Sequence, residues 1–202
     1  MILSTTMVTV LGAAAVIFCA FSGFESARPF FKTLGMPDLV SAPVSKRILV
    51  GNLSSIFGGM IAAVWIWAIQ RQEVVGQTSL CVSGSGCANA LSDHTLNAIP
   101  FTNLQYGLFF VIWFCVLSFF ALSIHLDHNW SKNGGFLNWG RNLSLIGSVI
   151  AIIMLVTHLG MVEESPAICP LCLIVVVANL LTLFQFHQLQ NLHSDGAWTS
   201  KS

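Results

Sequence analysis

Residues 106–126 read YGLFFVIWFCVLSFFALSIHL, without a single Asp, Glu, Lys or Arg. A helix of this length rises about 30 Å, which is the thickness of the hydrocarbon core of a bilayer. Four further apolar stretches run from about 5 to 21, 49 to 69, 142 to 161 and 170 to 187. The whole chain is 55% hydrophobic and only 8% charged, whereas about a quarter of the residues in soluble domains are charged. The sequence therefore predicts a membrane protein with five spans.

Helices are the expected spanning element, because an isolated span must satisfy its own backbone hydrogen bonds and no ten-residue alternating barrel pattern is present. We therefore predict an all-α fold, a small polytopic bundle. The eight Lys and Arg residues form no run, and the formal net charge is zero. Nothing in the sequence supplies the basic patch that neutralises nucleic-acid phosphates, so a nucleic-acid partner is not expected.

Basic residues mark the cytoplasmic side, since they collect in cytoplasmic loops near the ends of spans. Arg71 alone lies in residues 70–105, and the connection 162–169 has none. The remaining seven fall on the opposite side: Arg28, Lys32, Lys46, Arg47, Lys132, Arg141 and Lys201. Residues 70–105 and 162–169 are therefore predicted to be extracytoplasmic.

The first apolar stretch is expected to be a retained span and not a cleaved signal, because residues 1–9 lack the basic residues that begin a signal peptide. Cleavage would also leave the four basic residues of 22–48 on the outside, against the charge rule. Pro29, Pro37 and Pro43 interrupt this segment too often for one helix, so we predict a cytoplasmic connector.

Four of the six cysteines form two pairs, in Cys81-Val-Ser-Gly-Ser-Gly-Cys87 and Cys169-Pro-Leu-Cys172. Both pairs fall on the predicted extracytoplasmic side, where disulfides form and persist. The other two, Cys19 and Cys115, lie inside apolar stretches, where a single Cys is usually a small buried hydrophobic residue. Redox chemistry is therefore permitted for the paired cysteines.

The second pair opens the last span, with Pro170 at a plausible first helical position. The helix dipole then favours a thiolate at Cys169, and Cys172 follows one turn deeper on the same face. We expect one sulfur to face the aqueous loop and the other to face the hydrocarbon. This arrangement predicts a relay from the loop pair through the second pair to a lipid-soluble acceptor of two electrons, such as a quinone.

Each pair also has a simpler interpretation. Cysteines separated by five residues in an exported loop can form a structural disulfide, and a lone Cys-X-X-Cys can be half of a zinc site. No further Cys-X-X-Cys-like motif and no His-rich partner is present, so no metal is predicted. Two other function classes stay open: a transmembrane carrier of reducing equivalents, and a structural subunit with inert disulfides.

Ser92, Ile99-Pro100 and Asn103-Leu-Gln-Tyr-Gly107 follow the first pair. Together with the two cysteine pairs, they resemble the vitamin K epoxide reductase family over about residues 49–188. The resemblance implies a four-helix bundle of spans two to five around a quinone pocket, with one additional N-terminal transmembrane helix. Residues 1–48 are then that helix and its connector, and 189–202 form a cytoplasmic tail.

The activity that the resemblance implies is that of a quinone-dependent thiol-disulfide oxidoreductase. Bacterial members reoxidise a periplasmic thioredoxin-fold protein and pass the electrons to ubiquinone or menaquinone. No thioredoxin domain follows the bundle, so the partner is expected to be a separate protein. The expected location is the inner (plasma) membrane, with both cysteine pairs on the extracytoplasmic side.

The resemblance also assigns roles to the cysteines. Cys172 matches the thiol that meets the quinone, and Cys169 matches the thiol that exchanges with the loop pair. Cys81 and Cys87 are similar to the shuttle pair, and which of them attacks Cys169 stays open.

Three polar residues match family positions at the cofactor site. Asn103 corresponds to an Asn that hydrogen-bonds a quinone carbonyl, Ser92 to a Ser that orders the loop, and Asn179 to an Asn of some relatives. The alternatives are that Asn103 is a helix-packing or capping amide, that Ser92 is a helix N-cap and that Asn179 packs in the core. Val176 stands where some members carry a Tyr that donates a second hydrogen bond, so quinone binding would depend on Asn103 and apolar contact.

Overall fold

The computed structural model describes residues 5–22, 28–33, 35–74, 98–99, 102, 104–126, 130–161 and 169–198. Within these ranges the chain is helical, apart from turns and one isolated β-bridge between Ala98 and Gln105. Five helices are long and apolar enough to cross a membrane, which confirms the predicted all-α fold with five spans. They are α1 (Thr5–Ser22), α4 (Val44–Val74), α6 (Tyr106–Leu126), α7 (Trp130–Met161) and α8 (Pro170–Ser194).

The connector between α1 and α4 contains two short helices, α2 (Arg28–Thr33) and α3 (Pro37–Val40). This confirms that its prolines prevent one continuous helix: Pro37 begins α3, because a residue without an N–H is tolerated in the first turn. Phe31 of α2 is buried and packs edge-on against Phe18 of α1, with ring centroids 5.7 Å apart. The connector is thereby held against the end of α1.

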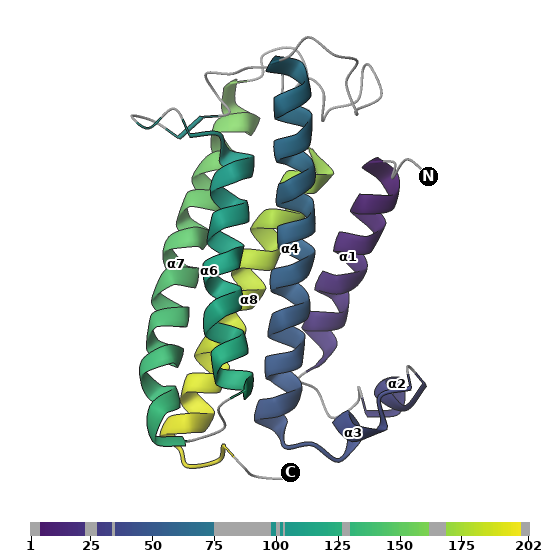
Figure 1. Cartoon of the computed structure of the whole chain (residues 1–202), viewed down its shortest axis with the longest axis vertical. Coiled ribbons are helices and arrows are strands. Elements are labelled where there is room, and N and C mark those ends of the chain that lie inside the picture. Colours follow the sequence, from purple (N-terminus) through teal and green to yellow (C-terminus); the bar gives the residue numbers. More distant parts are fainter. Residues whose placement is uncertain are drawn as a thin grey trace.

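The long helices lie side by side (Figure 1). α4 contacts α6 and α8, α7 also contacts α6 and α8, and α1 packs against α4 and α8. Because α4, α6, α7 and α8 alternate in direction, α4 and α7 end where α6 and α8 begin (Figure 1). We call this end of the molecule the Cys169 end, and the opposite end the Val44 end.

Three helices extend beyond the apolar stretches that the sequence predicted. α4 begins at Val44 instead of 49, α7 at Trp130 instead of 142, and α8 continues to Ser194 instead of 187. Hydropathy locates only the apolar part of a helix, whereas the helix continues until the backbone is interrupted. Pro43 precedes α4, and the end of α8 is closed by Gly196, with a φ of 71°, and by a 3.0 Å hydrogen bond from the Ala197 N–H to the Leu192 carbonyl.

Glycines let the helices pack closely against buried aromatic rings, and large apolar residues also cover the outward face of the bundle. A Cβ added to Gly140 of α7 would lie 2.6 Å from the ring of Phe186, and one added to Gly59 of α4 would lie 2.3 Å from the ring of Phe114. Spanning helices associate through such close packing, because lipid is as apolar as the side chains it touches. The outward face of α7 carries exposed Leu145, Ile146, Val149, Ile152, Ile153 and Val156.

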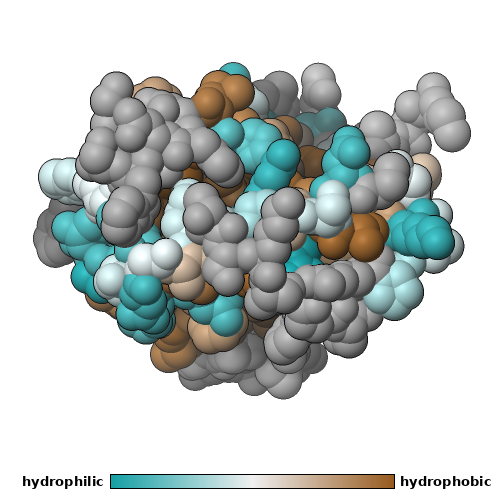
Figure 2. Space-filling view, turned by 90° about the horizontal axis from the view of Figure 1, so that it is seen from below, coloured by the Kyte–Doolittle hydropathy of each residue, from teal (hydrophilic) through white to brown (hydrophobic). Residues whose placement is uncertain are grey.

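The Val44 end is closed by the segment that follows α8. The Ser45 hydroxyl donates a 2.5 Å hydrogen bond to the Trp198 carbonyl, and the Trp198 side chain is buried. Arg47, in the first turn of α4, is fully buried as well. Hydrophilic side chains are mixed with apolar ones at this end (Figure 2), as expected where a bundle leaves the hydrocarbon.

Candidate functional site

Cys169 is the N-cap residue of α8, and Pro170 is the first helical residue, as predicted. Its backbone is extended, with φ −74° and ψ 115°, and its carbonyl accepts the first helical hydrogen bond, 3.1 Å from the Leu173 N–H. The N–H groups of Leu171 and Cys172 lie in the first turn, where a helix offers them no acceptor. The positive end of the α8 dipole is therefore next to the Cys169 sulfur.

Both cysteine side chains are buried, with 3% of Cys169 and 4% of Cys172 exposed. The prediction that one sulfur faces water and the other faces hydrocarbon is therefore wrong. Because α8 packs against α1, α4 and α7, the face that carries Cys172 points into the protein. The outward face of this turn is formed by Pro170 and Leu173 instead, both of which are exposed.

The other predicted site residues, Cys81, Cys87, Ser92 and Asn103, lie outside the described residues.

The segment that leads into α6 is described on both sides of position 103. The Ile99 N–H donates a 2.9 Å hydrogen bond to the Leu104 carbonyl, within a turn closed by the bridge between Ala98 and Gln105. A Cβ on Gly107 would lie 2.6 Å from the backbone nitrogen of Trp67, so only glycine lets α6 approach α4 this closely. The turn is thereby fixed to α4 at the Cys169 end.

Asn179 lies two turns beyond Cys172 on α8 and is fully buried. Its Nδ2 donates a 2.9 Å hydrogen bond to the Val175 carbonyl, and this acceptor determines which amide atom is the nitrogen. Its Oδ1 faces α7, 2.8 Å from the position of a Cβ on Gly147, and the Nε1 of Trp113 is 2.1 Å from that position. Asn179 therefore presents a hydrogen-bond acceptor to the interior.

Five residues form what we call the interior polar site: Asn52 (α4), Trp113 and Ser118 (α6), and Asn179 and Thr182 (α8). Among the described residues, no group bonds to either amide atom of Asn52, Trp113 Nε1, Ser118 Oγ, Asn179 Oδ1 or Thr182 Oγ1, although all six atoms are buried. A buried polar atom without a partner costs about 1–3 kcal/mol. Sequence reasoning selected only Asn179; the signal for the others was a polar residue within an apolar span, which usually faces the bundle interior.

Helix contacts place these residues in the interior of the bundle, over about two helical turns. Asn52 shares a face of α4 with Gly59, where a Cβ would touch Phe114 of α6 and Ala178 of α8. Thr182 follows Ala178 by one turn and Ser118 follows Phe114 by one turn, both toward the Val44 end. The Ser55 hydroxyl, one turn from Asn52, donates a 3.2 Å hydrogen bond to the Ala178 carbonyl. The interior polar site thus lies between the helices.

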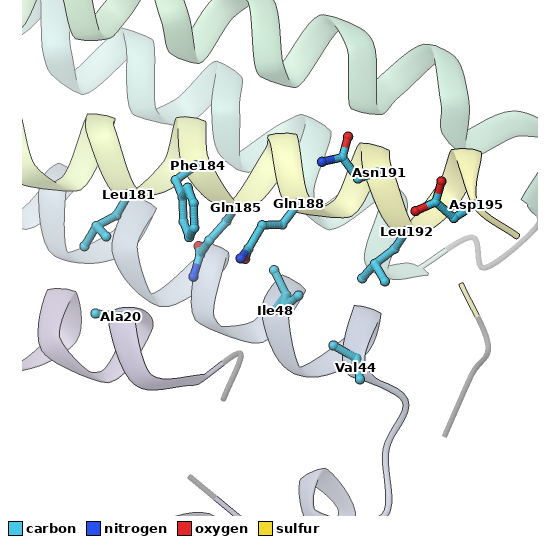
Figure 3. Close-up of a pocket in the computed structure, with 10 residues that line it drawn as sticks. All are labelled: Ala20, Val44, Ile48, Leu181, Phe184, Gln185, Gln188, Asn191, Leu192 and Asp195. Carbon is cyan, nitrogen blue, oxygen red and sulfur yellow. The ribbon is translucent and has the colours of Figure 1, made fainter. Parts of the chain in front are cut away.

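A pocket of about 600 Å³ opens between α1, α4 and α8 near the Val44 end (Figure 3). Gln185 and Gln188 point from α8 toward α4, and Asp195 lies at the end of α8 (Figure 3). The other lining residues are Ala20, Val44, Ile48, Leu181, Phe184, Asn191 and Leu192. Because these α8 residues lie beyond Asn179, the pocket is separate from the surroundings of Cys169 and Cys172.

Cys115 lies apart from both cysteines of α8. Its side chain is exposed on α6, and its sulfur is 3.9 Å from that of Met60. Cys19 belongs to α1, but its side chain is outside what the structure describes. No three His, Cys, Asp or Glu side chains meet in a metal-binding arrangement among the residues described.

Comparison of the chain with protein-family models, with curated proteins and with solved structures finds no match.

Proposed function

We propose that this protein is a quinone-dependent thiol-disulfide oxidoreductase, similar to the vitamin K epoxide reductase family. The observation that carries the proposal is the position of Cys169 and Cys172: they open a membrane-spanning helix, and both are buried inside the protein. A cysteine pair at a helix N-terminus favours the thiolate that thiol-disulfide exchange requires. Placement in a span brings the pair to the depth where a lipid-soluble acceptor dissolves.

In this proposal α4, α6, α7 and α8 form the catalytic four-helix bundle, and α1 is an additional helix on its outside. The closed ring of contacts among these four helices supports the division. The Cys169 end faces the extracytoplasmic compartment, because the basic residues Lys32, Lys46 and Arg47 belong to the Val44 end. A separate thioredoxin-fold protein delivers electrons there, and the membrane is the inner (plasma) membrane.

The loop pair carries electrons from the partner dithiol to α8. A thiolate of Cys81 or Cys87 attacks the Cys169 sulfur, the bond between Cys169 and Cys172 breaks, and Cys172 leaves as a thiolate. The second loop thiolate attacks the mixed disulfide, which forms the loop disulfide and releases Cys169. The positive end of α8 stabilises the negative charge on these sulfurs as it develops.

The apolar surroundings of Cys172 support the choice of a quinone. Val175 and Val176, one turn beyond Cys172 on α8, provide apolar contact, and Asn179 Oδ1 offers an acceptor without a partner in the described chain. When bound, the quinone accepts two electrons and two protons as the disulfide between Cys169 and Cys172 forms again. Asn179 would accept a hydrogen bond from a hydroxyl of the reduced form, and Asn103 would donate one to a carbonyl of the oxidised form.

The test uses the purified, reduced protein in detergent, with ubiquinone and menaquinone analogues added. Quinone absorbance and free thiols are followed together. We expect quinone reduction to match the loss of thiols, to be absent in Cys172→Ala and to persist in Cys115→Ala, the matched control on the outer face of α6. No quinone reduction with all thiols intact would refute the proposal and favour a structural role for the cysteines.

A further inference from the structure

Along α8, buried polar residues continue from Asn179 toward the Val44 end, whereas the residues between Asn179 and Cys172 are all apolar. Beyond Thr182 on α8 comes Gln185, which is buried and lines the pocket between α1, α4 and α8. Its Nε2 is 3.1 Å from the position of a Cβ on Gly51, the residue next to Asn52. Gln185 therefore lies between the pocket and the turn of α4 that carries Asn52.

Toward Cys172, the buried residues of α7 and α8 are apolar. Val175 and Val176 of α8, with Ala151 and Met154 of α7, are buried on the way from Asn179 to Cys172. Seven residues of α8 separate Asn179 from Cys172, a rise of about 10 Å. The acceptor of the proposed reaction has to contact Cys172 within this apolar belt.

The helices pack closely around the interior polar site. α7 comes so close to α6 and α8 that a Cβ on Gly147 would collide with Trp113, and α4 comes equally close to α6 at Gly59. The polar atoms there include donors, on Asn52, Trp113, Ser118 and Thr182, and acceptors, on Asn52 and Asn179. Water is the ligand that both donates and accepts, and a buried water typically makes about three hydrogen bonds.

We propose that the interior polar site binds a chain of water molecules that enters through the pocket at the Val44 end and delivers protons to the acceptor beside Cys172. The water site stands on the geometry alone, whereas the delivery of protons rests on the proposed function. In each turnover the two thiols release two protons toward the Cys169 end, and their two electrons pass to the quinone. The two protons that the quinone gains come from the Val44 end, so the reaction moves charge across the membrane.

The water site is tested by X-ray radiolytic labelling of the purified protein in ¹⁸O-water, because water bound beside a side chain labels that side chain even when it is buried. We expect ¹⁸O on Trp113 and none on Phe110, which is buried one turn nearer the Cys169 end. The double variant Asn52→Leu, Thr182→Val should lower the Trp113 label to the level of Phe110. An unlabelled Trp113 in the wild type, or an equal label in the variant, would overturn the site.

Proton delivery is tested with the protein in sealed vesicles, oriented so that its Val44 end faces the lumen. The lumen contains a pH-sensitive dye. Reduced thioredoxin outside is the reductant, and a short-chain ubiquinone analogue is the acceptor. We expect the lumen to become alkaline in proportion to the quinone reduced, and the double variant to slow quinone reduction by about 100-fold, as for loss of a proton-transfer group. Thr182→Ser, which keeps the hydroxyl, should retain both signals.

Quinone reduction at the full rate without alkalinisation of the lumen would overturn proton delivery through this route. If the wild type reduces no quinone, the proposed function has failed instead, and the labelling of Trp113 still decides whether the water site exists.

Discussion

Gly147 of α7 is a position where one added methyl group should strongly destabilise the bundle. Its Cβ would lie 2.1 Å from the Nε1 of Trp113 and 2.8 Å from the Oδ1 of Asn179, well inside van der Waals contact. The indole stacks on Phe109, with ring centroids 5.3 Å apart and planes 26° from parallel, so it cannot move without losing that contact. Gly147→Ala therefore forces the packing of α6, α7 and α8 to change.

The expected magnitude combines three effects. Overpacking of an interior costs about 1–3 kcal/mol, and loss of an aromatic pair costs about 0.5–1.5 kcal/mol. Alanine in a helix gains about 0.5–1 kcal/mol over glycine. We expect Gly147→Ala to lower the free energy of unfolding by about 1–3 kcal/mol overall.

Gly135, also on α7, is the matched control because a Cβ there would meet nothing within 4 Å. Gly135→Ala should raise the free energy of unfolding by about 0.5–1 kcal/mol. Both variants are compared by reversible unfolding in mixed micelles with increasing dodecyl sulfate, followed by tryptophan fluorescence. Equal stabilities for the two variants would refute the close approach of the helices at Gly147.

Trp198→Ala should lower the free energy of unfolding by about 3 kcal/mol, because it leaves a cavity at a buried position. Trp139→Ala is the control, because this side chain is 62% exposed and its loss should change the free energy by less than about 0.5 kcal/mol. Equal melting temperatures of the two variants would contradict the closure of the Val44 end. Cys169→Ala should abolish oxidation of a reduced thioredoxin-fold partner, measured by its free thiols, and Cys115→Ala should not; activity in the first variant would reject the assigned relay. Asn103→Ala should slow quinone reduction by roughly 10-fold to 100-fold, for a lost hydrogen bond of about 1.5–3 kcal/mol, and an unchanged rate would leave Asn103 as a packing residue.

The spans could be predicted from sequence because the cost of placing charge in hydrocarbon is large, and each apolar stretch became a helix. The face that each helix buries could not be predicted. In a soluble protein the buried face is the apolar one, but here both lipid and interior are apolar, so the pattern carries little information. In α7 the interior receives Gly140, Gly147 and Ala151, and lipid receives the larger residues.

For the candidate site too, local features could be predicted from the sequence and helix packing could not. The position of Cys169 as an N-cap followed from Pro170 and the start of the apolar stretch, since these are local signals. The burial of Cys172 did not follow, because it depends on which helices pack around α8. Asn52 and Thr182 went unnoticed for a related reason: their burial arises from the packing of α4 against α8, which are far apart in the sequence.

The burial of Cys169 and Cys172 also determines which reductants can reach their sulfurs. α8 begins well short of the level at which α4 ends (Figure 1), and less than a twentieth of either side chain is exposed. Dissolved thiols of low molecular weight are thus kept from direct collision with these sulfurs. In the proposed reaction, electrons would therefore reach these sulfurs through a protein segment that fits the site, and small soluble thiols would not pass electrons directly from this pair to the quinone.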